Sequence, residues 1–305
     1  MANGFNEFNI DCKEEIESHV ILLDYKDHNL SFTNMYLWRK LYKLRLYICD
    51  DFIIVLSELD GVTFSLNPIC TLENIPKAID FLIEYFESVD KPFRIHNCVR
   101  KVYEVINDKY GDYFTYEQDR DAFDYLYSIE KIKGYSGKKL QKKRNHVNNF
   151  IKEYEGRYEI KEISSSDKKI IDDCIALTHW WAQAKDQDDF YLPTEVDGTI
   201  DVLQNFDQLS CEGIAMYIDG QIKAFSFGTQ LNNETAVLNV EKADGEIVGL
   251  FPFLRQNLVN TFFCDLQYLN TEDDVGEEGL RKSKLSYKPE YLVEKYIITR
   301  TDQHV

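Results

Sequence analysis

Residues 213–242 read GIAMYIDGQIKAFSFGTQLNNETAVLNVEK. Two dipeptides that favour tight hairpin turns, Asp219-Gly220 and Asn232-Asn233, divide this stretch. The runs beside them are rich in β-branched and aromatic residues, which favour strands. These runs lie at about 213–218, 221–229 and 234–242. The stretch therefore predicts a three-stranded antiparallel meander.

The same order of elements is predicted in both halves of the chain, from apolar spacing and turn signals. The first half contains helices 12–23 and 31–41, strands 44–49, 52–57 and 62–66, helix 73–88, strand 93–96, helix 98–110 and strand 113–117. The second half adds to the meander strand 157–163, helices 167–185, 195–209 and 250–263, and strands 265–269 and 291–298. This repetition predicts a tandem duplication of one α/β (α+β) unit, each with a mixed central sheet flanked by helices. We place the N-terminal unit at 1–125 and the C-terminal unit at 126–305.

Composition limits the function classes. The 305-residue chain has a net charge of −18, which argues against broad, non-specific binding of polyanions. Its seven cysteines are widely spaced, so they predict buried free thiols rather than a disulfide framework or a metal site. The start lacks the pattern of a secretory signal, and no stretch approaches the ~18 apolar residues that span a bilayer. We therefore expect a cytoplasmic protein without a transmembrane segment.

Segment 131–146 contains seven basic side chains and no carboxylate. A helix over 137–154 is predicted there, with an apolar stripe formed by Leu140, Val147, Phe150, Ile151 and Tyr154. Two basic flanks would border that stripe, one with Lys138, Lys142 and Asn145 and the other with Lys139, Lys143 and His146. Such a helix suits a phosphate-bearing ligand, with Arg144 able to make bidentate contacts. Two alternatives are a solvated helix face and a connector that packs between the two units.

Segment 270–289 is predicted to be a long irregular stretch, in which five acidic residues precede four basic ones. Loops of this length within compact domains are uncommon and are often functional. Gly276 and Gly279 permit tight turns there. We interpret the segment as a site loop, the alternative being a surface loop held by internal ion pairs.

A third candidate follows the strand at 234–242. The turn through Gly245 and Gly249 leads into the apolar helix 250–263, so free backbone amides could bind an anion there. Ordinary turn geometry explains these glycines equally well. No pattern typical of covalent or metal chemistry is present, so no metal is expected.

Several of these motifs together resemble a known bacterial family, that of the C-terminal domain of phosphatidylglycerol lysyltransferase. The residues that carry the resemblance are Tyr125-Leu126-Tyr127, Gly137-Lys138-Lys139, Lys143-Arg144-Asn145-His146, Glu241-Lys242-Ala243, and the pattern from Asn270 through Glu272-Asp273-Asp274, Gly276, Gly279-Leu280-Arg281, Lys284 and Ser286-Tyr287 to Pro289. The resemblance implies two tandem acyltransferase folds of the GNAT type. The best-known relatives transfer a lysyl or alanyl group from aminoacyl-tRNA to a lipid head group, and they have a separate membrane region.

The resemblance and the residue patterns together lead to a first hypothesis. An amine or hydroxyl acceptor, on a small molecule, a lipid head group or a peptide, attacks an acyl-CoA thioester or an aminoacyl-tRNA ester directly. The residues expected to take part in catalysis are Glu241, Asp273, Arg281 and Lys284. Donor phosphates would be bound by Lys138, Lys142, Arg144, Gly245 and Gly249, and substrate by Asn270, Glu272 and Tyr287. The alternative hypothesis is a non-catalytic module that binds a nucleotide, tRNA or a protein partner.

Overall fold

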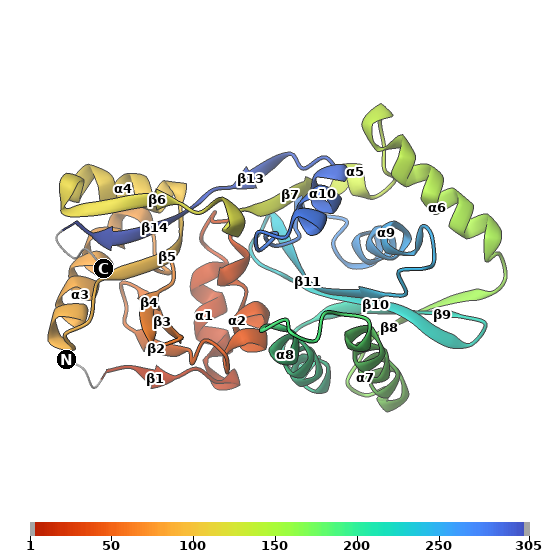
Figure 1. Cartoon of the computed structure of the whole chain (residues 1–305), viewed down its shortest axis with the longest axis horizontal. Coiled ribbons are helices and arrows are strands. Elements are labelled where there is room, and N and C mark those ends of the chain that lie inside the picture. The colour runs from red at the N-terminus through yellow and green to blue at the C-terminus, as the bar shows by residue number, and fades with distance from the viewer. Residues whose placement is uncertain (1–3, 302–305) are drawn as a thin grey trace.

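A computed structural model describes residues 4–301. Within these residues the strands form two seven-stranded mixed sheets, which lie side by side with helices on their faces (Figure 1). The first sheet has the order β1-β2-β3-β4-β5-β14-β6, and the second has the order β13-β7-β12-β11-β10-β9-β8. Both sheets are antiparallel except at one central pair, β4–β5 in the first and β11–β12 in the second.

The first half contains all the elements predicted for it, with shifts of a few residues, and one strand more. They are β1 (Asn6–Glu7), α1 (Lys13–Val20), α2 (Phe32–Trp38), β2 (Arg45–Ile48), β3 (Ile53–Leu59), β4 (Val62–Ser65), α3 (Ile75–Ser88), β5 (Arg94–Val99), α4 (Arg100–Tyr110) and β6 (Phe114–Gln118). The two-residue strand β1 was not predicted. Its pairing with β2 extends the first sheet by one strand at its edge.

The second half also follows the predicted order. Its elements are β7 (Asp124–Ser128), α5 (Ile129–Ile132), α6 (Gln141–Glu153), β8 (Tyr158–Glu162), α7 (Lys168–Gln183), α8 (Leu192–Gln204), β9 (Glu212–Ile218), β10 (Gln221–Gln230), β11 (Thr235–Ala243), α9 (Leu250–Phe262), β12 (Tyr268–Asn270), α10 (Glu278–Ser286), β13 (Tyr291–Val293) and β14 (Lys295–Arg300). The predicted meander is β9–β10–β11, and its neighbouring strands pair antiparallel.

Two predictions for this half were wrong in part. The stretch 270–289 is not irregular throughout, because it contains α10. The helix dipole favours acidic residues at the start of a helix and basic residues near its end, which here are Glu277 and Glu278, and Lys284. The order of charges that we interpreted as typical of a loop therefore also favours a helix. The single strand predicted at 291–298 is two strands, β13 and β14, which lie in different sheets.

The last strand of the chain returns to the first sheet. Strand β14, from the end of the chain, lies between β5 and β6 of the first sheet, while β7 lies between β12 and β13 of the second. Figure 1 shows these connections crossing from one sheet to the other along the same edge of the molecule. The predicted boundary at 125/126 falls inside β7 and stays a prediction. The first sheet is therefore completed by a strand from the second half, whereas the second sheet is built from the consecutive strands β7–β13.

Apolar packing also joins the halves. One continuous buried cluster runs from Phe8 in the first half to Val240 in the second. Helix α2 packs on α8, where Gly198 permits the close approach, because a Cβ there would lie 2.4 Å from the carbonyl oxygen of Leu37. The seven cysteines are unpaired, and four of them are buried. Among the described residues, no helix combines the length and the apolar character needed to cross a membrane.

Candidate functional site

The site is built where two central strands of the second sheet diverge. Strands β11 and β12 are parallel neighbours only over 235–237 and 268–270, whereas β11 continues to Ala243. After Asn270 the chain turns away toward α10. The side of β11 beyond Val237 therefore faces helices rather than a hydrogen-bonded strand. We call this opening the wedge.

Glu241 on β11 lies in the wedge and is bound by Arg255 of α9. The guanidinium donates from Nε to one carboxylate oxygen at 3.2 Å and from Nη2 to the other at 2.7 Å. Only 8% of Arg255 is exposed, and its Nη1 is buried without a hydrogen-bond partner in the described part of the chain. The ring of buried Tyr287 lies over this guanidinium, 4.4 Å from ring centre to Cζ. The wedge therefore holds a buried ion pair with one unused N–H donor.

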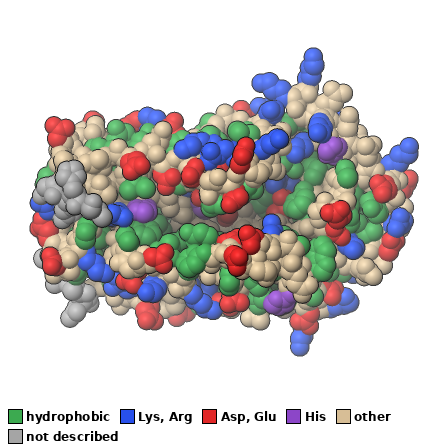
Figure 2. All heavy atoms as spheres, viewed as in Figure 1, with side chains coloured by type: hydrophobic (Ala, Val, Ile, Leu, Met, Phe, Trp, Pro, Cys, Tyr) green, Lys and Arg blue, Asp and Glu red, His purple; other side chains and the backbone are tan. Residues whose placement is uncertain are grey.

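A pocket of about 320 Å³ opens between α6 and the end of α10. Its lining residues are Lys139, Lys142, Lys143, His146, Ser286 and Lys288, and we call it the basic pocket. Figure 2 shows Lys and Arg side chains along the upper rim of a central hollow, where Figure 1 places α10 and α6. A pocket lined by cations without a carboxylate favours an anionic ligand.

Lys143 connects the basic pocket to the wedge. Its Nζ lies 3.5 Å from the centre of the Tyr287 ring, whose other contacts include Arg255. Burial, and then the charges of Arg255 and Lys142, lower the pKa of Lys143 to about 8. Burial and the charges of Lys142 and Lys143 likewise lower the pKa of His146. The positive charge gathered here is only partly balanced by the protein itself.

Gly249 holds the start of α9 against α6. It has φ +91°, and a Cβ there would lie 2.4 Å from the carbonyl oxygen of His146. A side chain at this position would separate the two helices, so the glycine is required for packing. Gly245, in contrast, has open space around it. The first turn of α9 has no side-chain cap and lies beside the His146 end of the basic pocket.

The structure divides the residues predicted to bind donor phosphates. Lys142 lines the basic pocket, whereas Lys138 lies just before α6 and is not among the lining residues. Arg144 donates from Nη1 to the carbonyl oxygens of Tyr135 and Gly137, at 2.6 and 3.4 Å. Its role in the structure is to hold the turn before α6.

Helix α6 itself is confirmed, and its burial pattern corrects two expectations. Val147 and Phe150 are buried as predicted, but Ile151 is 37% exposed. The helix packs on α9 at the outer side of the second sheet (Figure 1), so it does not lie between the two units as one alternative proposed.

Arg281 and Lys284 of α10 bind the loop that precedes it. Arg281 donates to both carboxylate oxygens of buried Asp274, at 2.9 and 2.6 Å, and to Asp121 at 2.6 Å. Burial raises the pKa of Asp274, but hydrogen bonds from Arg281 and Tyr125 outweigh this and lower it to about 2. Lys284 donates to the carbonyl oxygens of Thr271 and Asp273. Both cations therefore shape the loop 271–277.

The residues predicted to bind substrate occupy three different environments. Asn270 is buried and donates to Asp124 at 2.8 Å and to the carbonyl oxygen of Lys26 at 2.6 Å. Burial raises the pKa of Glu272 to about 7, and its Oε1 is buried without a hydrogen-bond partner among residues 4–301. The half-buried carboxylate of Asp273 forms no ion pair in that range. Tyr287 does not line the basic pocket itself, but its ring contacts Lys143, which does.

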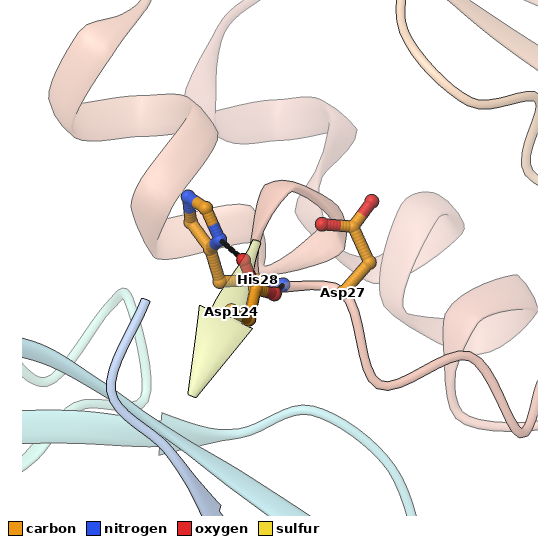
Figure 3. Close-up of side chains that lie close together, drawn as sticks. All are labelled: Asp27, His28 and Asp124. Carbon is orange, nitrogen blue, oxygen red and sulfur yellow. Dashed lines mark hydrogen bonds and ion pairs between the residues drawn. The ribbon is translucent and has the colours of Figure 1, made fainter. Parts of the chain in front are cut away.

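One group of side chains has the composition of a metal site. Asp27 and His28 come from one loop and Asp124 from the start of β7, and one ligand atom of each lies within 4.8 Å of the others (Figure 3). The Nζ of Lys295, at the start of β14, lies 2.8 Å from Asp27 and 2.5 Å from Asp124. This ammonium provides the positive charge that a metal would supply. The cluster therefore joins β7 of the second sheet to β14 of the first.

Some residues of the site were missed by sequence reasoning. Arg255 was not singled out, although a lone arginine within an apolar helical run is itself a signal of a buried ion pair. Lys143 and His146 were recognised as one flank of the basic helix but were not assigned a role. Lys288 could not be linked to them, because only the fold brings the end of α10 beside α6.

Comparisons with known proteins agree with this architecture. A family model described as "Phosphatidylglycerol lysyltransferase, C-terminal" matches residues 21–299. An uncharacterised protein of Mycoplasmoides gallisepticum is 31% identical over 178 residues, which are 57% of this chain and 55% of that protein. The chain thus spans about half the length of this curated relative.

Two solved structures share the fold. A conserved protein of unknown function from Bacteroides thetaiotaomicron has a TM-score of 0.91 and 29% identity, covering 97% of this chain and 99% of that one. The L-PGS structure from Bacillus licheniformis has a TM-score of 0.70 and 13% identity, covering 96% and 93%. The predicted fold class, two tandem GNAT-like units of the α/β type, is confirmed.

Proposed function

Because the chain belongs to the family of the phosphatidylglycerol lysyltransferase C-terminal domain, we propose that it transfers an acyl or aminoacyl group from a phosphate-bearing donor to an amine or hydroxyl acceptor. Family and fold together indicate a transferase of the acyltransferase type. The identity of the donor, an acyl-CoA or an aminoacyl-tRNA, and that of the acceptor belong to the proposal.

The observation that carries the proposal is the position of the basic pocket beside the wedge. Lys143 touches Tyr287, Tyr287 covers Arg255, and Arg255 binds Glu241 on β11. A donor with its phosphates in the basic pocket would therefore extend its acyl group toward the place where β11 and β12 separate. Lys139, Lys142 and Lys288 would act as point charges on the phosphates.

The chemistry requires no covalent intermediate on the protein. A lone pair of the acceptor forms a bond to the donor's carbonyl carbon, and the C–O or C–S bond breaks with its electrons on the leaving oxygen or sulfur. The proton of the acceptor passes to a base and from there to the leaving group. The unused Nη1 donor of Arg255 is suited to a developing oxyanion.

Asp273 is the better candidate of the two predicted carboxylates for contact with the acceptor. Glu241 is already bound bidentately by Arg255, so its negative charge is neutralised. Asp273 is half-buried and has no cation paired to its side chain between residues 4 and 301. Its backbone carbonyl is held by Lys284, which fixes the position of the residue. We assign Arg281 and Lys284 to positioning this loop.

The test is a transfer assay with labelled acetyl-CoA, lysyl-tRNA and alanyl-tRNA against amines, peptides and phosphatidylglycerol vesicles. Transfer by the wild-type chain from one donor class is expected, together with loss of transfer in Asp273→Asn at an unchanged melting temperature. Asp265→Asn, at an acidic residue outside the loop 271–277, serves as the control. An Asp273→Asn variant that transfers at the wild-type rate would remove Asp273 from the mechanism.

One observation favours a second candidate function, a module that binds without catalysis. Glu241, Arg281 and Lys284, three of the four residues predicted to act in catalysis, are engaged in contacts within the protein. Such a module would bind a nucleotide, tRNA or a protein partner through the basic pocket. Saturable, salt-sensitive binding without transfer across the whole panel is its expected signature.

A further inference from the structure

Lys143 has surroundings unlike those of the other lysines in the basic pocket. Its side chain is half-buried against the Tyr287 ring, whereas Lys139 and Lys142 are exposed. No carboxylate lies within ion-pair distance of Lys143 in the described part of the chain. An ammonium in this position loses much of its hydration and receives no paired anion in exchange.

The charged and titratable groups around Lys143 come from four elements. They are Lys139, Lys142 and His146 at α6, Arg255 on α9, Glu241 on β11, and Tyr287 and Lys288 after α10. Glu241 is the single acid among them, and it is bound by Arg255. Cations therefore prevail around Lys143, and burial with Arg255 and Lys142 brings its pKa to about 8. Near that pH, about half of the molecules carry a neutral amine.

We propose that the basic pocket binds phosphate ester groups together with a proton, and that Lys143 takes up this proton. The inference rests on the proposed function, because it concerns the pocket assigned to the donor. A bound phosphate offsets the repulsion from Lys142 and Arg255, so it stabilises the ammonium form of Lys143. By linkage, phosphate binding must then be accompanied by proton uptake, and protonation must strengthen phosphate binding.

The lining of the pocket selects the ligand class. Its four lysines offer point charges from two sides, α6 and the end of α10, which suits an ion with several equivalent oxygens. A lining without carboxylates disfavours cations and zwitterions. Phosphate esters fit this pattern, and they occur both as terminal phosphates of nucleotides and as the internal phosphodiesters of RNA.

The sign and size of the effect follow from the state of Lys143 before binding. At pH 7 Lys143 is already protonated in most molecules, so binding takes up at most about 0.1 proton per molecule. The largest possible uptake is about 0.5 proton near pH 8 and about 0.9 near pH 9. Phosphate affinity therefore falls as pH rises, by up to about tenfold for each pH unit above about 8.

The experiment is isothermal titration calorimetry of the full chain near pH 8 and pH 9, in two buffers with different ionisation enthalpies. One probe is adenosine 3′,5′-bisphosphate. Phosphate monoesters lose their second proton with a pKa of about 6, so the charge of this probe is constant at pH 8 and 9. The other is an RNA trinucleotide with only internal phosphodiesters. The difference in heat between buffers measures proton uptake, and the tighter-binding probe identifies the phosphate source.

Two variants separate Lys143 from its neighbours. Lys143→Arg keeps a positive charge that is not lost in this pH range, so binding should persist while proton uptake and the pH dependence disappear. Lys142→Arg is the matched control in the same pocket and should retain uptake. Two results would overturn the inference and leave the proposed function untouched. One is wild-type binding without a buffer-dependent heat, and the other is undiminished proton uptake in Lys143→Arg. If neither probe binds, the donor pocket of the proposed function falls with it.

Discussion

The two sheets contain equivalent wedges, which we call the filled wedge in the first sheet and the open wedge in the second. In the first sheet, β4 and β5 pair in parallel at a single position, Ser65 opposite Ile95, and then separate. The segment after β4 stays beside β3, where Ile69 exchanges two backbone hydrogen bonds with Ile53, and Asn67 reaches β5 by accepting from the backbone N–H of Val99 at 3.2 Å. In the second sheet, the corresponding gap leads to the basic pocket.

This difference shows how a duplicated fold assigns separate tasks to its units. Asn67, Ile69 and Cys70 are buried in the filled wedge, so the protein's own chain occupies its interior. The second unit replaces this segment with a turn containing Gly249 and adds α6, which brings the lysines. The predictions below test the comparison, beginning with the link between the units.

The largest effect is expected from Lys295→Met, at the start of the strand that returns to the first sheet. The variant leaves the buried carboxylate of Asp27 without its cation and Asp124 with His28 as its remaining partner, which costs about 3–5 kcal/mol in free energy of unfolding. Urea unfolding measures the loss. The control is Lys101→Met, which breaks an exposed pair with Asp24 and should cost less than about 1 kcal/mol. Equal losses in both variants would contradict a coupling role for the buried cluster.

Gly249→Val should close the open wedge. The new side chain meets the carbonyl oxygen of His146 in a backbone conformation that suits glycine, so a loss of about 2–4 kcal/mol is expected. Binding of adenosine 3′,5′-bisphosphate should be lost as well, because α6 moves from α9. Gly245→Ala, with nothing within 4 Å, should leave stability and binding unchanged. A stable, binding-competent Gly249→Val protein would show that the glycine does not hold the pocket.

Glu272, in the loop after β12, is expected to make the folded protein less stable as pH rises. Its pKa is raised from 4.5 to about 7 in the folded state, so the folded protein keeps a proton that the unfolded chain releases. Stability therefore falls as pH rises from about 4.5 to 7, by up to about 3 kcal/mol. Glu272→Gln should be the more stable protein at pH 8 and should match the wild type near pH 4.5. Parallel urea-midpoint curves for both proteins would refute this.

The smallest effect is expected in the filled wedge. Asn67→Ala removes the hydrogen bond from Val99 and the one to the carbonyl oxygen of Pro68, for a cost of about 1–2 kcal/mol. Phosphate binding and transfer should not change, because Asn67 does not line the basic pocket. A changed donor affinity in calorimetry would indicate that the first unit also contributes a site.

Several features of the candidate site were visible in the sequence. The basic run 131–146 does lead into a helix that lines a pocket, and Lys142 belongs to that pocket. Arg144 could not be distinguished from its neighbours, because its binding to the carbonyl oxygen of Tyr135 depends on how the turn before α6 closes. The same limit applies to Arg281, whose partner Asp121 is far away in the sequence.

Hairpin turns, helical periodicity and motifs depend on residues that are close along the chain. The order of most elements, the duplication and the family could therefore be predicted from the sequence. The tertiary structure alone decided which strands complete which sheet, which wedge is open and which lysine is buried over Tyr287. The return of β14 to the first sheet and the pKa of Lys143 depend on contacts between distant segments. Burial and neighbouring charge exist only once those segments have packed together.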